Sequence, residues 1–135
     1  PSLNVDQQFV YDADQNFDML RFGLQEWKKV APYLLKEFYT LTPWHKEKDN
    51  TDFTAFCYYD PEKEDGVIFA FRQEKCSRDV LNISLPFIDS GDRYIITDEN
   101  SHEKTATNGT VTLQFDGPRT AKLLWVKKIL QLKEI

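Results

Sequence analysis

Apolar residues between positions 17 and 31 recur at spacings of three and four, which predicts an amphipathic helix. The residues on this face are Phe17, Leu20, Leu24, Trp27 and Ala31. Met19, Phe22 and Val30 widen the apolar arc, so we expect this helix to need cover from more than one side. Pro32 ends or kinks the helix, because it lacks an N–H group and restricts the residue before it. Residues 33–39 are expected to continue as a short turn or second helix.

The second half of the chain has the pattern of short strands separated by turn residues. Asp60-Pro61, Ser90-Gly91, Asn108-Gly109 and Gly117-Pro118 are turn signals. The predicted strands are residues 53–59, 67–72, 80–85, 94–97, 103–107, 110–115 and 121–127. About seven short strands at regular spacing predict an antiparallel β-sandwich preceded by the helix. We expect a helical segment over 1–45 and the sandwich over 46–135, with a charged connector at 46–52.

The predicted core follows the alternation within these strands. We expect it to contain Phe69, Phe71, Leu81, Ile83, Leu113, Leu123 and Trp125. These residues cannot all face one layer, because the segment from Val67 to Phe71 is apolar on both sides. A strand of this kind is typical of the centre of a sheet that is covered on both faces.

Composition and charge exclude several function classes. The chain has 135 residues and a formal net charge of −5, and no basic stripe is present to bind phosphates, which argues against nucleic-acid binding. No apolar run reaches the roughly 20 residues that a membrane-spanning helix needs. The first residue is Pro1 and not Met, so we expect a processed or excised piece of a larger protein. The sequence indicates no cellular compartment.

Residues with catalytic or metal-binding chemistry form no convincing constellation in the sequence. The acidic residues cluster in predicted turns, where solvated carboxylates that fix local hydrogen bonds are the ordinary explanation. His45 and His102 are far apart and have no ligand partner at metal-site spacing. Cys57 and Cys76 could form one disulfide, but Cys57 lies in a strand pattern and is expected to be a buried free thiol. We therefore predict no catalytic residue, cofactor or metal for this chain.

Aromatic residues are the remaining candidates for ligand contact, because sugars stack on exposed rings. The platform candidates are Trp44, Tyr58 and Tyr94, with Tyr59 and Trp125 as further rings. The alternative for each ring is packing in the core or against a neighbouring domain, and Trp125 fits core packing better. Trp44 lies in the connector and is the most open case.

Several sequence segments together resemble the C-terminal region of melibiase-like α-galactosidases and related glycoside hydrolases. They are Asp18-Met19-Leu20-Arg21, Glu26-Trp27-Lys28, Ala31-Pro32-Tyr33, Glu37-Phe38-Tyr39-Thr40-Leu41-Thr42-Pro43, Gly66-Val67-Ile68-Phe69-Ala70-Phe71-Arg72 and Tyr94-Ile95-Ile96-Thr97-Asp98. The resemblance covers nearly the whole chain. In that family a catalytic (β/α)8 barrel precedes a small antiparallel β-domain, so the resemblance implies that the helix is the last barrel helix. No residue here matches the catalytic motifs of the family.

The leading interpretation is a non-catalytic β-domain that braces the catalytic barrel of a glycoside hydrolase. A carbohydrate-binding module and a protein-interaction β-domain are the alternatives. Phe17, Leu20, Leu24 and Trp27 are predicted to form a packing seam, against the barrel in the parent protein. In the chain alone we expect the sandwich or a second copy to cover this seam, because exposed apolar patches favour association.

Overall fold

A computed structural model describes residues 17–43 and 50–129 of the chain. The described part begins with helix α2 (Phe17–Val30), followed by a short 3₁₀ turn η1 (Ala31–Tyr33). The strands are β1 (Glu37–Thr40), β2 (Phe53–Asp60), β3 (Asp65–Arg72), β4 (Val80–Ser84), β5 (Tyr94–Asp98), β6 (Lys104–Thr107), β7 (Thr110–Gln114) and β8 (Thr120–Lys128). No helix in these ranges is long and apolar enough to cross a membrane.

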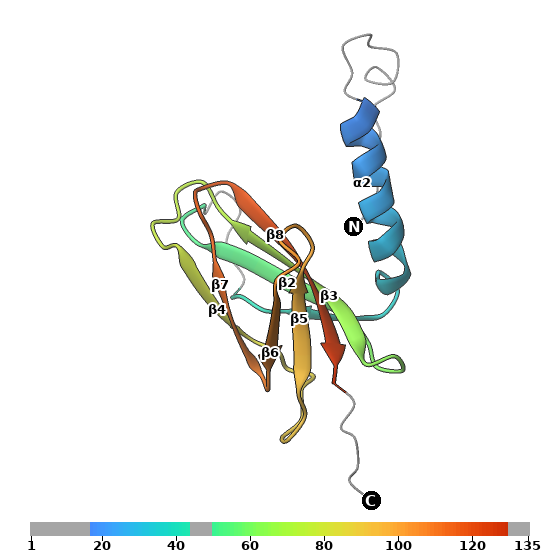
Figure 1. Cartoon of the computed structure of the whole chain (residues 1–135). Coiled ribbons are helices and arrows are strands. Elements are labelled where there is room, and N and C mark those ends of the chain that lie inside the picture. Colours follow the sequence, from blue (N-terminus) through green and yellow to red (C-terminus); the bar gives the residue numbers. More distant parts are fainter. Residues whose placement is uncertain (1–16, 44–49, 130–135) are drawn as a thin grey trace, which may run out of the picture.

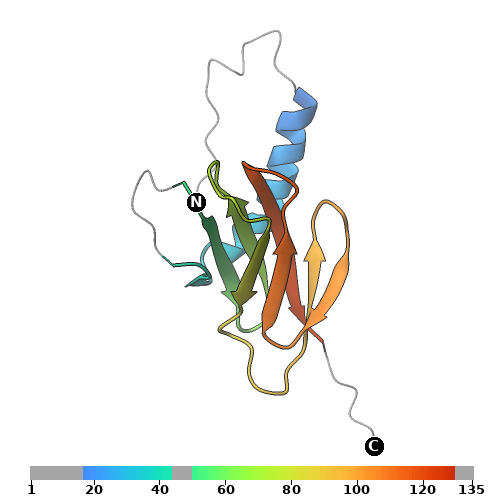
Figure 2. The same cartoon turned by 90° about the vertical axis from the view of Figure 1, so that its left-hand side faces the viewer.

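The described strands form two layers of antiparallel sheet. The six-stranded sheet has the order β1-β2-β3-β8-β5-β6, and the two-stranded sheet consists of β4 and β7. The two-stranded sheet lies on one face of the six-stranded sheet, and α2 lies on the opposite side (Figures 1 and 2). The fold is therefore mainly β, with the helix preceding the strands as the sequence predicts.

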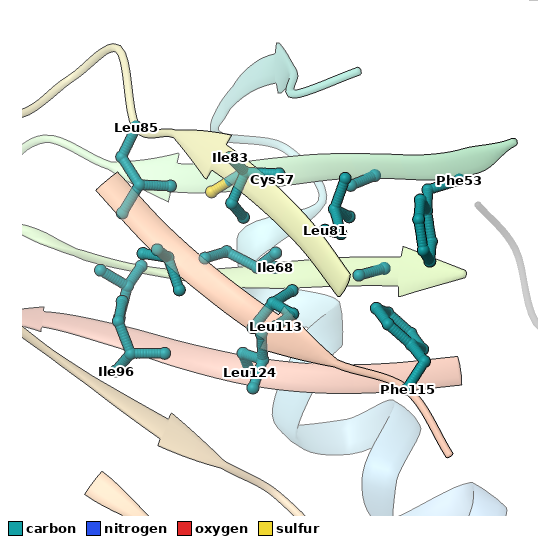
Figure 3. Packing of buried hydrophobic residues seen from close by; sticks show 14 of the residues in the cluster. Phe53, Cys57, Ile68, Leu81, Ile83, Leu85, Ile96, Leu113, Phe115 and Leu124 are labelled. Carbon is teal, nitrogen blue, oxygen red and sulfur yellow. The ribbon is translucent and has the colours of Figure 1, made fainter. Parts of the chain in front are cut away.

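The core lies between the two sheets and is built from every second residue of each strand, those whose side chains point toward the other sheet. Its labelled members in Figure 3 are Phe53, Cys57, Ile68, Leu81, Ile83, Leu85, Ile96, Leu113, Phe115 and Leu124. The rings of Phe53 and Phe115 lie 5.2 Å apart at one end of this layer. Leu81, Ile83 and Leu113 are buried here, which confirms their predicted core positions.

Four of the predicted core residues lie instead on the other face of the six-stranded sheet. Phe69, Leu123 and Trp125 are half-buried in a second cluster, and Phe71 is 38% exposed. The expectation that the predicted residues cannot all face one layer is confirmed. Placing these four between the sheets would be wrong, because β3 and β8 are apolar on both faces and the alternation could not show which face meets the two-stranded sheet. Ile68 and Ala70 on β3, with Leu124 and Val126 on β8, take the inner positions.

The seven predicted strands are all present, with ends that differ by one or two residues. The prediction of a turn or helix over 33–39 holds up to Lys36, where a turn follows η1, and was wrong from Glu37 onward. Residues Glu37–Thr40 form β1, an edge strand whose Phe38 lies opposite Tyr58 of β2. The six-stranded sheet therefore begins before the boundary expected at residues 45 and 46. Pairing with β2, which is distant in sequence, overrides the local preference of this segment.

Helix α2 has Asp18 in its first turn and Lys28 and Lys29 in its last, an arrangement that complements the helix dipole. The helix meets the sandwich at its C-terminal end, and its N-terminal part extends beyond the sheets (Figure 1). Among its residues only Val30 is buried. The position of Val30 places the start of η1 directly on the six-stranded sheet.

Candidate docking surface

The six-stranded sheet carries a second apolar face on the side away from the two-stranded sheet, which we call the outer face. Strand register puts its side chains into rows that cross β1, β2, β3 and β8. The outer face comprises Phe38, Phe56, Tyr58, Val67, Phe69, Phe71, Leu123 and Trp125. Residues of the opposite parity on the same strands fill the core, so the central strands are apolar on both faces.

Aromatic rings on the outer face contact one another in a continuous group. Phe56 and Phe69 stack with centroids 5.1 Å apart, and Phe71 lies 6.1 Å from Phe56. Phe38 lies 5.2 Å from Tyr58 on the neighbouring strand. Phe38 is nevertheless 52% exposed and Phe71 38% exposed, so rings at two ends of the group remain in water. Contiguous exposed apolar surface of this kind marks an interaction site more often than an ordinary surface does.

The end of the helix covers one part of the outer face. Val30, Tyr33 and Leu34 pack against Val67 and Tyr58 there. The ring of Tyr33 lies 5.7 Å from that of Trp125. Burial raises the pKa of Tyr33 to about 12, and the carboxylate of Asp65 adds to this increase. The phenol is therefore neutral at physiological pH and anchors the junction as a packing residue.

A polar contact also fixes the helix to the sheet. Lys29 Nζ lies 2.8 Å from Glu99 Oε1, and Trp125 Nε1 donates a hydrogen bond to Glu99 Oε2 at 2.5 Å. The hydrogen bond from Lys29 lowers the pKa of Glu99 and outweighs its partial desolvation. Glu99 thus joins the last turn of α2 to the Trp125 side chain of β8 through a carboxylate that stays ionised.

The rest of the helix surface is more exposed than the sequence predicts. Leu20, Leu24 and Trp27 are half-buried, and Phe17 is exposed. Met19 and Phe22 are 62% and 51% exposed. The expectation that the sandwich covers the seam is therefore wrong for the described residues, and cover by a second copy stays a prediction. The physical reason is that only the last turn of α2 meets the sheet, while its earlier turns extend beyond the sheets (Figure 1).

The predicted sugar-stacking residues do not form a platform in the described part of the chain. Tyr94 is buried in the core, where its hydroxyl lies 2.7 Å from that of Tyr59. Tyr58 is only 7% exposed, because Phe38 and Phe69 pack around its ring. Stacking on Tyr58 or Tyr94 was therefore a wrong prediction, since neither ring presents a face to solvent. Trp44 lies outside the described residues.

The two cysteines in the described ranges lie among packing residues. Cys57 and Cys76 are both buried and free, which confirms the predicted free thiol at Cys57. Burial raises the pKa of Cys57 to about 12, so this thiol is not a nucleophile at neutral pH. Within residues 17–43 and 50–129, no three His, Cys, Asp or Glu side chains are grouped so that they could hold a metal ion.

Sequence reasoning missed Phe38 and Phe56 as members of the outer face. A signal for Phe56 was present in β2, where Phe56 and Tyr58 occupy one parity while Phe53, Ala55 and Cys57 occupy the other. Such a strand predicts cover on both sides, and the two-stranded sheet covers only one. Phe38 had no comparable signal, since β1 itself was not predicted.

A comparison with models of known protein families and with curated protein sequences finds no match for this chain.

Proposed function

We propose that this chain is the non-catalytic C-terminal β-domain of an α-galactosidase-like glycoside hydrolase, and that the outer face and α2 dock on the catalytic barrel of that enzyme. The observation that carries the proposal is the outer face, an aromatic sheet surface with Phe38 and Phe71 exposed. Most of the sequence segments that resemble the family lie on or next to these elements, on α2, η1, β1 and β3, and one further segment forms β5.

The position of the helix relative to the outer face supports a single partner for both. Val30 and Tyr33 pack on the outer face, so the exposed side chains of α2 extend from the edge of that same surface. Phe17 and Phe22 on the helix are 44% and 51% exposed. Burial of a large apolar side chain contributes roughly 1.5–3 kcal/mol. A partner that contacts both surfaces gains this contribution from several rings at once.

The proposed role is bracing, because the outer face supplies packing surface and the sequence predicts no carboxylate pair suited to glycoside hydrolysis. We predict that the 135-residue chain alone does not hydrolyse an aryl α-galactoside. Turnover by the pure chain that a substitution within it abolishes would contradict this prediction.

The decisive experiment begins with the gene sequence before the codon for Pro1. The proposal requires a catalytic barrel there, and a start codon or signal peptide directly before Pro1 would overturn it. In the full enzyme, Phe71→Asp should lower the melting temperature and weaken α-galactosidase activity on heating. Val80→Asp is the matched control, since Val80 is 43% exposed but lies on the two-stranded sheet.

Two alternatives give different results with the isolated chain. A carbohydrate-binding module that uses Trp44 predicts saturable shifts in tryptophan fluorescence when galactosides are added. A second copy docked through α2 and the outer face predicts a dimer in sedimentation that Phe71→Asp dissociates. Absence of both effects, together with an upstream barrel, favours the bracing role.

A further inference from the structure

An open cleft runs along one edge of the two-stranded sheet, away from the outer face. It has a volume of about 340 Å³ and is lined by β7, by the β5–β6 hairpin and by β8. In Figure 2 the β5–β6 hairpin extends to one side of β7, so no strand of the described ranges faces this part of the six-stranded sheet. None of the residues that line the cleft is aromatic, which disfavours a stacked sugar.

The hydrogen-bond pattern of β7 shows which backbone groups point into the cleft. Leu85 N donates to Gly109 O, and Phe115 N donates to Asp79 O. Bonded pairs alternate in an antiparallel ladder, so positions 109, 111, 113 and 115 direct their backbone groups toward β4. Thr110, Thr112 and Gln114 therefore direct theirs to the opposite edge. No strand among the described residues pairs with that edge.

A contact at one end of the edge supports this orientation. The hydroxyl of Thr107 on β6 donates a hydrogen bond to Thr110 O at 2.7 Å. A side chain from the cleft side thus already satisfies one carbonyl of β7. The backbone groups of Thr112 and Gln114 lie further along the same edge.

The β7 strand also lacks the usual features that prevent pairing at sheet edges. Its sequence, Thr-Val-Thr-Leu-Gln, contains no charge and no proline. Edge strands in natural proteins are commonly protected by charged residues, prolines or bulges. The outer strands of the six-stranded sheet fit that rule, since β1 contains Glu37 and β6 contains Lys104.

We propose that this cleft accepts an extended peptide segment of a partner protein, which adds a third strand to the two-stranded sheet beside β7. The five residues of β7 offer an edge of about 14–17 Å, which matches four or five extended residues. Main-chain hydrogen bonds to Thr112 and Gln114 provide affinity, as in other cases of strand addition. This proposal does not depend on the proposed enzyme partner.

Charge in the cleft defines the chemistry of the peptide. Lys122 Nζ lies 3.5 Å from Asp98 Oδ2, so these two charges offset each other. Glu103 also lines the cleft and is exposed, and its carboxylate forms no ion pair with a described residue. The preferred segment is therefore an extended β-forming peptide whose residues are uncharged apart from one basic residue near Glu103.

The test uses a synthetic hexapeptide of alternating valine and threonine with an N-terminal lysine. Backbone amide signals of the 135-residue chain are followed by NMR during titration. The free protein should exchange the amide hydrogens of Thr110, Thr112 and Gln114 faster than those of Val111 and Leu113. Bound peptide should shift the signals of the first three residues and slow their exchange.

Thr112→Pro removes one N–H group from the cleft edge without removing a backbone hydrogen bond to β4, and should weaken peptide binding by about tenfold or more. Asn82→Pro is the matched control on β4. Thr112 Oγ1 donates to Asn82 Oδ1 at 2.7 Å, so both substitutions lose the same side-chain hydrogen bond. The control should bind the peptide like the wild type, and Glu103→Gln should reduce the salt dependence of binding.

A peptide N-methylated on the residues that face β7 provides a test without altering the protein, and it should not bind. The proposal is overturned if the unmodified peptide causes no shift at millimolar concentration. Equal binding by the N-methylated peptide, or equal loss in both proline variants, would also overturn it. Shifts in the cleft with galactose but not with peptide would assign the cleft to a small polyhydroxylated ligand instead.

Discussion

Replacement of Ile83 by alanine tests the assignment of the core most directly. Ile83 is 2% exposed and lies between the sheets, opposite Val111 in the strand register. The substitution removes three carbons, which at about 0.8 kcal/mol each amounts to about 2.4 kcal/mol of lost transfer free energy. The cavity left behind raises the expected loss to about 3–4 kcal/mol, within the range measured for such changes. For a domain of this size the melting temperature should fall by about 10 °C or more.

The matched control is Val80→Ala on the same strand. Val80 is 43% exposed, so the loss of its two methyl groups should change the free energy of unfolding by about 0.5 kcal/mol or less. Urea and thermal unfolding followed by circular dichroism measure both variants. Equal losses at the two positions, or an unchanged melting temperature for Ile83→Ala, would show that the parity assigned to β4 is wrong.

Three further predictions follow from local geometry. Gly66→Ala should destabilise the fold by about 1–3 kcal/mol in urea unfolding, because a Cβ there would lie 2.4 Å from the carbonyl oxygen of Tyr58. Glu99→Gln should make the stability depend less on pH in acid, because Lys29 lowers the pKa of Glu99 in the folded protein. In the wild type, the resulting stabilisation is lost as the pH falls below about 4.3 through that lowered pKa. Cys57 should react with Ellman's reagent only after unfolding, because it is buried with a pKa of about 12.

Each of these predictions has a control in the same chain. Gly23→Ala on the exposed side of α2 meets no atom within 4 Å and should stabilise the helix by about 0.5–1 kcal/mol. Glu74→Gln removes an exposed ion pair with Arg119. It should leave the pH dependence of the free energy of unfolding in acid nearly unchanged. Thiol labelling is compared in native buffer and in denaturant. Rapid labelling of Cys57 in native buffer would contradict its burial.

Alternation and turn residues were sufficient to predict most of the strands. Leu81 and Ile83 alternate with polar residues on β4. The two-residue period of a strand with one solvent-exposed face therefore predicted their burial. The Asn108-Gly109 turn similarly predicted the β6–β7 connection, and Gly109 adopts the positive φ of 152° that favours glycine. These features depend on neighbours within a few residues, which the sequence displays directly.

The tertiary structure alone decided which face of the central strands is inside. Phe69 and Ile68 are both large and apolar, and only the pairing of β3 with β2 and β8, under a two-stranded sheet, places Ile68 in the core. The same long-range pairing made β1 from a segment expected to be a turn or helix. Only the last turn of α2 meets the sheet, through buried Val30 and the Lys29–Glu99 ion pair. The sequence thus determined where strands form, because strand period and turn chemistry are local. It did not determine the exposed aromatic face or the open edge of β7, because both depend on how many strands each layer contains.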